Sequence, residues 1–353
     1  MKFNFLKNAM IALMIVSFTG SMLISCKDKD DDGEKADKTA LTALISECEG
    51  IINNASTDDY PQSAINAFTT VLNTVKTASE KSGITQIEVD NLVTQLTEAK
   101  NIFIAAAYED IPAAALLIGL SFDEGQGTEL TAAGKGLKAV LKKAPAELFG
   151  DSKPLPTFVD GKKGKAIQFS EGSHLEIATY SRPDFEGKTL SISVWVKPSA
   201  TKGPNYIMSY NDWHSWKFQL QDQNKPFFTV NATGGITDAD NEADFSAPNG
   251  EWTHLVVALD LNNELLTFYV NAEEKKRWDI NSKPTLTGTI TPNANSWPII
   301  IGAFASYQAA MSDWDGWTTE NWNNYFEGAM DEFKVYNIAL TQGQVTRLYE
   351  TEK

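Results

Sequence analysis

The spacing of apolar residues divides the chain into two parts of different structure. Over residues 38–110, apolar side chains recur every three or four positions, which is the period of amphipathic helices. Breaks at Pro61 and Gly83 separate three such stripes, and Thr85 and Glu88 form a capping-box pair at the start of the third. Short turns between amphipathic helices predict an antiparallel three-helix bundle.

From Pro112 onward, the pattern changes to short apolar runs separated by Gly, Pro, Asn and Asp. The run from Leu190 to Val196 alternates in the way a half-buried strand does. Many short strands without intervening helices predict an all-β sandwich or jelly roll over residues 112–353. The predicted strands are Leu116–Phe122, Ala166–Phe169, His174–Ile177, Leu190–Val196, Tyr206–Tyr210, Trp216–Leu220, Phe227–Val230, Thr253–Leu259, Leu265–Val270, Ile299–Gly302 and Met330–Tyr336.

The gaps between these strands predict two long loops, at 241–249 and 303–324. Thr341–Glu350 predicts a short closing helix capped by Thr341. The chain is therefore expected to be multidomain, with helices first and strands after them.

The first 26 residues have the parts of a secretory signal: Lys2 and Lys7, an apolar stretch, and small residues before a cleavage point. The ending Leu23-Ile24-Ser25-Cys26 resembles a bacterial lipobox, which implies removal of residues 1–25 and acylation of Cys26. The alternative is a retained transmembrane helix, which the short span and Gly20 disfavour. Two or three acyl chains would anchor the protein stably to a membrane.

Residues 26–37 follow as an acidic segment with no apolar side chain larger than Ala36, so we expect a solvated tether. An acidic cluster directly after the lipidated Cys resembles the surface-export signal of Bacteroidetes lipoproteins. This resemblance implies a lipid-anchored, surface-exposed protein of the outer membrane.

Composition removes several classes of function. Lys and Arg number 30 against 46 Asp and Glu, and a net charge of −16 disfavours contact with the phosphates of nucleic acids. Two cysteines exclude a disulfide framework and a thiolate zinc cluster. With Cys26 acylated, Cys48 is the only thiol, and its place on the first helical stripe predicts a core residue.

Local motifs add two resemblances. Residues Thr85–Asp90 and the Leu/Ala stripe after them resemble the FIVAR-type bundles of bacterial surface proteins, which implies that the bundle is a stalk. Six ordered segments resemble concanavalin A-like, LamG-like jelly rolls: Ile118–Gly127, Gly161–Phe169, Leu190–Pro198, Glu251–Leu255, Phe268–Asn271 and Phe326–Tyr336. The second resemblance implies the fold of residues 112–353 but not their function, because this fold serves lectins, hydrolases and adhesion modules.

Catalysis is not expected from these residues. Laminarinase-like relatives carry Glu-x-Asp-x-Glu on one strand, which places two carboxylates roughly 5–5.5 Å apart at one glycosidic bond. No predicted strand has this motif, and its nearest counterpart, 238–242, falls in a Gly/Asp-rich segment that predicts a loop.

The nine tryptophans lie between Trp195 and Trp322. Trp195 and Trp252 match structural positions of the family, whereas two other aromatic clusters lie at a predicted hairpin and in the loop after Gly302. Aromatic faces stack on sugar rings and Asp or Asn binds hydroxyls, so these clusters predict a glycan site. The alternative is that the rings have no ligand and only hold a long loop against the sandwich. The candidate residues are Asn211, Asp212, Trp213, His214, Trp216, Tyr307, Asp313, Trp314, Asp315, Trp317 and Trp322.

Two further expectations come from the resemblance. The pentraxin branch of this superfamily binds ligands at an Asp-Asn pair after the Ser-Tyr strand and at a loop after the Leu-Gly strand, which implies that Asn211, Asp212 and the loop after Gly302 share one edge.

Laminarinase-like jelly rolls often hold calcium where the first and last strands meet, which implies structural Ca²⁺ at Asp123 and Asp331. The alternative is that both acids only end strands, and no other cofactor is expected.

The sequence thus favours non-catalytic binding of a polysaccharide or host glycan by a surface lipoprotein that touches the membrane only through its lipid anchor. A protein-binding adhesion module is the alternative, and a glycan hydrolase or lyase is a weaker one. No nucleic-acid partner is expected.

Overall fold

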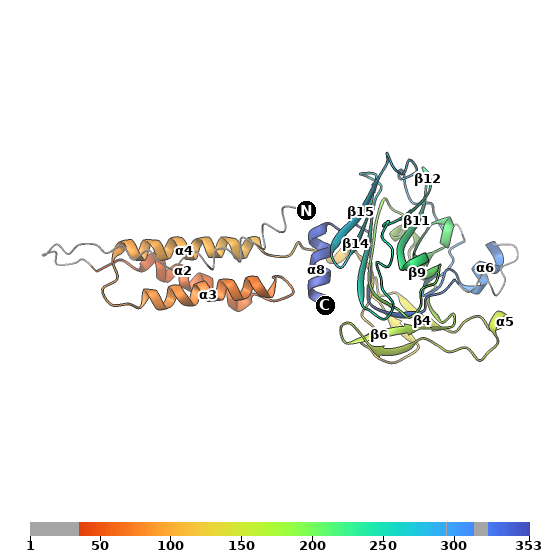
Figure 1. Ribbon diagram of the computed structural model, residues 1–353, viewed down its shortest axis with the longest axis horizontal. Coiled ribbons are helices and arrows are strands. Elements are labelled where there is room, and N and C mark those ends of the chain that lie inside the picture. The colour runs from red at the N-terminus through yellow and green to blue at the C-terminus, as the bar shows by residue number, and fades with distance from the viewer. Residues whose placement is uncertain (1–34, 294, 314–323) are drawn as a thin grey trace. The chain divides into compact units, whose positions relative to one another are not determined.

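The computed structural model describes residues 35–293, 295–313 and 324–353. The chain divides into two compact units after Glu109 (Figure 1). The predicted order of a helical bundle followed by an all-β sandwich is confirmed.

In residues 35–109, the described part of the first unit, the helices are α2 (Thr39–Asn54), α3 (Gln62–Ser79) and α4 (Gln86–Ala105). Phe103 stacks on Tyr60 and Phe68, with ring centroids 4.2 and 4.8 Å apart, at the centre of their shared core. Cys48 is fully buried in this core and burial raises the pKa of its thiol, so it is a structural residue. The predicted capping box at the start of α4 is present.

No helix among the residues described by the structure is both long and apolar enough to span a bilayer.

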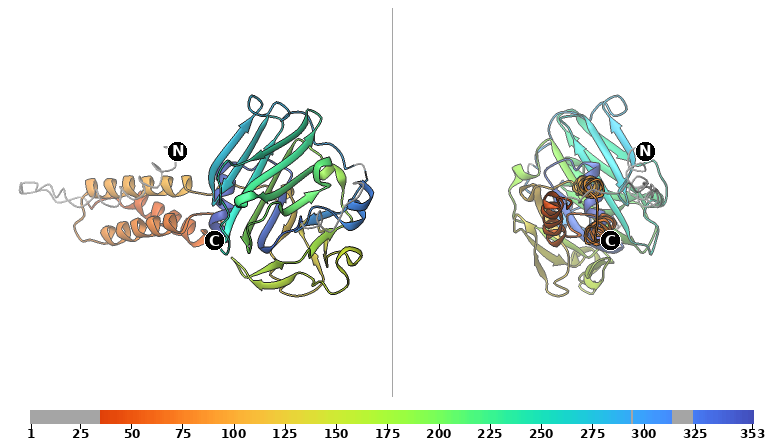
Figure 2. Two further views of the ribbon diagram at one scale, coloured as in Figure 1. Left: turned by 45° about the vertical axis from the view of Figure 1, so that its right-hand side comes forward. Right: turned by 90° about the vertical axis from the view of Figure 1, so that its left-hand side faces the viewer.

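The second unit is a sandwich of two antiparallel sheets (Figure 2). In the first sheet, the order is β15-β14-β13-β8-β17-β1-β3, with β6 beside β17 and β5 beside β6. Its strands are β1 (Leu116–Leu120), β3 (Ala133–Gly134), β5 (Thr157–Asp160), β6 (Lys165–Phe169), β8 (Thr189–Pro198), β13 (Thr253–Asp260), β14 (Leu265–Val270), β15 (Glu273–Asp279) and β17 (Gly328–Tyr336).

The second sheet has the order β12-β11-β10-β9-β16-β7-β4-β2. Its strands are β2 (Glu129–Thr131), β4 (Lys138–Lys142), β7 (His174–Ile177), β9 (Asn205–Tyr210), β10 (Trp216–Gln221), β11 (Lys225–Ala232), β12 (Gly235–Asp240) and β16 (Ile299–Ile301). Short helical turns lie at η1 (Ala113–Ala115), α5 (Ala146–Phe149), η2 (Arg182–Asp184), η3 (Asp212–His214) and η4 (Asp222–Asn224).

The core lies between the two sheets. Ile192 and Val194 of β8 enter it from the first sheet, and Phe218 and Phe228 enter it from the second. The other face of β8 is also covered, because α8 (Gln342–Glu352) packs Val345 over that side of the sheet. Thr341 caps α8 as predicted, in a capping box with Gln344.

Several elements differ from the predictions. Residues 238–242 were expected in a loop, but Asp238 and Asp240 lie on β12, and the expected loop 303–324 contains α6 (Tyr307–Asp313). The prediction also missed β15, whose seven residues include six charged ones. Edge strands such as β12 and β15 pair on one side only, so they tolerate charged residues and lack the apolar alternation that predicts a strand.

Candidate functional site

The hairpin between β9 and β10 is built on two residues with left-handed backbone. Asn211 and Asp212 have φ of 58° and 46°, a conformation that Asn and Asp tolerate better than other side chains. The Ser209 hydroxyl accepts the Asp212 amide at 2.8 Å, and the Asn211 carbonyl accepts the His214 amide at 2.9 Å. This turn buries Asp212, leaves Trp213 half-buried and exposes His214.

A buried charged cluster lies behind the hairpin. Lys217 is 2% exposed, and its Nζ donates to the Tyr206 hydroxyl at 2.9 Å. Tyr206 in turn donates to Asp212 Oδ1 at 3.1 Å, and Lys217 Nζ lies 3.5 Å from the same oxygen. Burial raises the pKa of Asp212 to about 6, although Lys217 counteracts this, and burial lowers the pKa of Lys217.

Lys217 also fixes the orientation of Trp213. Its Nζ lies 3.8 Å from the centre of the Trp213 ring, which is close enough for a cation–π interaction. Asn231 donates to the carbonyl of Trp213 at 3.3 Å. The indole is therefore a half-exposed ring held by contacts on the protein side.

Tyr206 connects this hairpin to the loop that follows β16. Gly302 begins that loop with φ of 91°, where a Cβ would lie 2.8 Å from the Phe169 ring, so glycine is required. The Phe304 ring lies 6.0 Å from the Tyr206 ring, and Ala309 and Ala310 of α6 belong to the same apolar cluster. Figures 1 and 2 show α6 beside the sheet that contains β9. The two predicted aromatic clusters thus meet through Tyr206.

Two of the candidate residues, Trp216 and Asp212, are buried and do not face a ligand. Trp216 is 0% exposed, stacks on Tyr210 with ring centroids 5.4 Å apart, and donates its indole N–H to the Phe185 carbonyl at 3.3 Å. Its side chain belongs to the core because β10 turns alternate residues inward. Asp212 is also buried, so it organises the hairpin instead of facing solvent.

The other candidates lie in the second cluster. Tyr307 is half-buried at the start of α6, and Asp313 is its last residue. Trp314, Asp315, Trp317 and Trp322 lie outside the described residues.

Asp123 and Asp331 both hold the β5–β6 turn. Asp331 is fully buried and accepts the amides of Lys162 and Lys163 on Oδ2, at 2.7 and 3.0 Å. Asp123 accepts the Lys165 amide at 2.8 Å. Burial raises the pKa of Asp331 to about 6, although these amides favour its charged form.

Calcium needs six to eight oxygen ligands, whereas the neighbours of Asp331 Oδ2 are N–H donors. No group of three His, Cys, Asp or Glu side chains suited to a metal occurs in residues 35–293, 295–313 and 324–353. A calcium ion at Asp123 and Asp331 stays a prediction, and the hydrogen bonds of both acids are explained by the turn.

Comparison with known proteins identifies the sandwich. Residues 169–346 match the family described as the concanavalin A-like lectin/glucanases superfamily. The chain belongs to this superfamily. No curated protein matches it.

Several solved structures of similar fold show low identity. Domain 4 of AbnA, a GH43 extracellular arabinanase from Geobacillus stearothermophilus in complex with arabinotriose, is 22% identical with a TM-score of 0.46, and the match covers 67% of this chain and 98% of that one. The binding domain of Paraclostridial Mosquitocidal Protein 1 is 18% identical with a TM-score of 0.47, covering 67% and 52%. The botulinum neurotoxin serotype D binding domain is 13% identical with a TM-score of 0.44, covering 68% and 52%. The match spans about half of each of these two toxin chains.

In this superfamily member, the acidic side chains of β12 accept hydrogen bonds from neighbouring strands of the same sheet. Asp238 Oδ1 accepts the Thr229 hydroxyl at 2.6 Å, and Asp240 Oδ2 accepts the Gln221 amide at 2.9 Å. Glu242 has left the strand with φ of 57° and pairs with Lys276. Residues 238, 240 and 242 therefore do not lie on one strand, unlike the Glu-x-Asp-x-Glu motif expected of laminarinase-like relatives.

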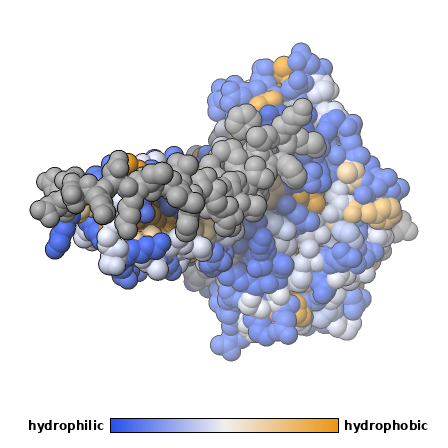
Figure 3. Space-filling view, turned by 60° about the vertical axis from the view of Figure 1, so that its left-hand side comes forward, coloured by the Kyte–Doolittle hydropathy of each residue, from blue (hydrophilic) through white to orange (hydrophobic). Residues whose placement is uncertain are grey.

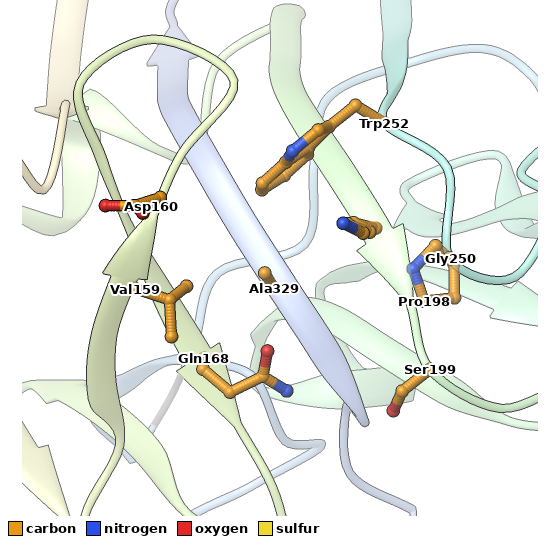
Figure 4. Close-up of a pocket in the computed structure, with 9 residues that line it drawn as sticks. Val159, Asp160, Gln168, Pro198, Ser199, Gly250, Trp252 and Ala329 are labelled. Carbon is orange, nitrogen blue, oxygen red and sulfur yellow. The ribbon is translucent and has the colours of Figure 1, made fainter.

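The sequence prediction missed a second aromatic position. Trp252, which was expected to be structural, is half-buried and lines a pocket on the outer face of the first sheet (Figure 4). The sequence around Trp252 did not indicate a pocket, because the pocket is formed by strands that are distant in sequence.

Proposed function

We propose that this member of the concanavalin A-like superfamily is a non-catalytic glycan-binding module, carried by a lipid-anchored protein on the outer face of an outer membrane. The observation that carries the binding proposal is the half-exposed Trp213 ring, held in place by Lys217. A ring that is already ordered loses little conformational entropy when a sugar stacks on it. Asn211 and His214 flank the ring with side chains that can hydrogen-bond hydroxyl groups.

The loop after Gly302 supplies the second wall of the proposed site. Tyr206 ties this loop to the hairpin through its contacts with Asp212 and Phe304. Tyr307 and Asp313 of α6 are candidate residues in this wall, and Trp314, Asp315, Trp317 and Trp322, which lie outside the described residues, stay predictions.

The partners of the acids support binding without catalysis, and one face of the sandwich offers little apolar surface to a protein partner. Asp212 is buried against Lys217, and the acids of β12 are hydrogen-bonded to neighbouring strands. A protein-binding surface would favour a contiguous apolar patch. Among the coloured atoms of Figure 3, hydrophilic residues predominate on the visible face of the sandwich, and apolar residues form separate spots.

Replacing Trp213 with alanine is expected to weaken glycan binding by about ten- to hundredfold, as loss of one stacked ring costs roughly 1–3 kcal/mol in nucleic-acid recognition. A glycan array with the mature protein would select the ligand, and calorimetry would measure both affinities. Trp278→Ala is the matched control, since its half-buried ring also contacts lysines, Lys276 at 4.1 Å and Lys283 at 4.6 Å, but lies on β15. Equal loss of affinity in both variants, or shortening of the bound glycan during incubation, would contradict the proposal.

Replacing Cys26 with alanine is expected to move the protein from the membrane fraction to the soluble fraction. The lipobox-like ending places the acylated residue at Cys26, and acyl chains supply the membrane affinity. Fractionation of cells that express each form is the measurement, with Cys48→Ala as the control. Unchanged membrane partition of the Cys26 variant would remove the lipid anchor from the proposal.

A further inference from the structure

The pocket beside Trp252 is created by a small residue in a row of larger ones. Ala329 of β17 pairs with Lys197 of β8 on one side and with Gln168 of β6 on the other. All three residues line the pocket, and Ala329 forms its floor (Figure 4). The pocket has a volume of about 220 Å³. This is below the roughly 300–1,000 Å³ of pockets for drug-sized ligands, so it has room for about one sugar residue.

The walls combine an aromatic face with polar atoms. Figure 4 shows the Trp252 side chain extending toward β17, the strand of Ala329, with Val159 on the other side of that strand. No acceptor among the described residues receives the Trp252 indole N–H. Gln168 donates its amide to the Phe169 carbonyl at 3.1 Å, which leaves its carbonyl oxygen as an acceptor toward the pocket.

The two charged residues that line the pocket, Asp160 and Lys197, differ in their partners. Asp160 accepts a hydrogen bond from Lys165 at 2.7 Å, which holds the pKa of this carboxyl below its usual range. Figure 4 shows the Asp160 carboxylate directed away from the centre of the pocket. Lys197 is exposed, and no described carboxylate pairs with it. Lys197 is therefore the one cation among the described residues that line the pocket, and the one lining carboxylate, Asp160, is paired with Lys165.

We propose that this pocket binds one carboxylate-bearing sugar residue, such as a uronic or sialic acid. The Trp252 ring stacks on the apolar face of the sugar, Lys197 pairs with its carboxylate, and Gln168 and Ser199 hydrogen-bond its hydroxyl groups. The pocket lies on the first sheet, whereas Trp213 lies at a hairpin of the second. This inference goes beyond the proposed function and does not depend on the Trp213 site.

The test compares acidic sugars with their neutral methyl esters on the full chain. Glucuronate, galacturonate and N-acetylneuraminate would be titrated against each matching ester, with dissociation constants measured by ligand-observed NMR. We expect at least one acid to bind about fivefold more tightly than its ester, the upper range for an exposed ion pair. Raising the salt concentration from about 0.05 to about 0.5 M should reduce this preference.

Matched variants separate charge from stacking. Lys197→Gln should abolish the preference for the acid, whereas Lys188→Gln, which removes an exposed lysine directly before the same strand β8, should keep it. Trp252→Ala should weaken binding of acid and ester alike, by at least about tenfold. Trp252→Phe should restore part of the affinity, which distinguishes lost stacking from misfolding.

Three outcomes would overturn the proposal. The first is equal affinity for all three acids and their esters. The second is an unchanged preference in the Lys197 variant. The third is binding of acetate as tight as that of the sugars, which would show that the pocket recognises charge alone. Trp213→Ala should leave the acid preference intact, so a failure of the Trp213 site is seen separately.

Discussion

Replacing Asp331 with alanine is expected to lower the free energy of unfolding of the sandwich by about 4 kcal/mol. The Asp331 carboxylate is fully buried and accepts three backbone amides: those of Lys162 and Lys163 on Oδ2, and that of Glu332 on Oδ1 at 2.8 Å. The alanine variant leaves these donors without their acceptor. A hydrogen bond to a charged group contributes about 1.5–3 kcal/mol, and the three share one carboxylate, so they are not additive.

Asp123→Ala is the matched control for this prediction. Asp123 accepts one amide of the same turn, that of Lys165, and is solvent-exposed, so we expect a loss of about 1 kcal/mol. Urea unfolding followed by tryptophan fluorescence reports on the sandwich alone, because all nine tryptophans lie between residues 195 and 322. Equal losses in the two variants would show that Asp331 has no special role in holding the turn.

The parent protein is expected to lose about 2.7 kcal/mol of stability through His254 when the pH falls to 4.5. Replacing His254 with phenylalanine is expected to remove this loss. His254 is fully buried on β13, its Nε2 lies 2.8 Å from the Ser193 hydroxyl, and its ring lies 5.2 Å from the ring of Trp195. Burial, together with the nearby Lys334 cation, lowers the pKa of His254 to about 3.

The sign of the effect follows from proton binding. In the unfolded chain, His254 takes up a proton below the ordinary histidine pKa of 6.5, whereas in the folded chain it stays neutral down to about pH 3. Stability is therefore complete above about pH 7 and is lost as the pH falls, by about 1.36 kcal/mol for each pH unit below 6.5. At pH 4.5, two pH units below 6.5, the expected loss in the free energy of unfolding is about 2.7 kcal/mol.

The measurement is the difference in free energy of unfolding between variant and parent at pH 7.5 and at pH 4.5. Asp212, Asp331 and Glu352 have pKa values raised to about 6, so each gains stability as the pH falls. Asp212 and Asp331 are unchanged in the variant and cancel in the difference, whereas Glu352 Oε2 lies 3.9 Å from His254 Nε2, so its titration is coupled to that of His254. His214→Phe, at an exposed position, is the control. A difference that does not change with pH would mean that His254 is protonated in the folded chain.

Periodicity was sufficient to predict the elements whose packing repeats along the chain. The stripe of α4 and its capping pair Thr85 and Glu88 predicted that helix, and the short apolar run Leu265–Val270 predicted β14 with the bounds observed. These signals are local, because every turn of a helix and every second residue of a strand faces the same core. The charged edge strand β15 carries no such signal and was missed.

The candidate site was predictable only in part. The sequence identified Trp213 and Trp216 as neighbours at one hairpin, but the strand pairing of β10 decided that Trp216 enters the core and Trp213 does not. Apolar and polar residues alternate along β10, and this pattern predicts that Lys217 faces solvent. It is buried because the rings of Trp213 and Tyr206, from the turn and from β9, cover it.

The sequence by itself determined the order of the two units, the helical and strand periods and the presence of aromatic clusters, since these depend on neighbours within a few residues. Only the tertiary structure decided which side chains share a surface. The pocket at Trp252 brings together Gln168, Lys197 and Ala329, whose positions differ by up to 161 residues. Their meeting depends on the register of β6, β17 and β8, and a shift of one residue would turn each side chain to the opposite face.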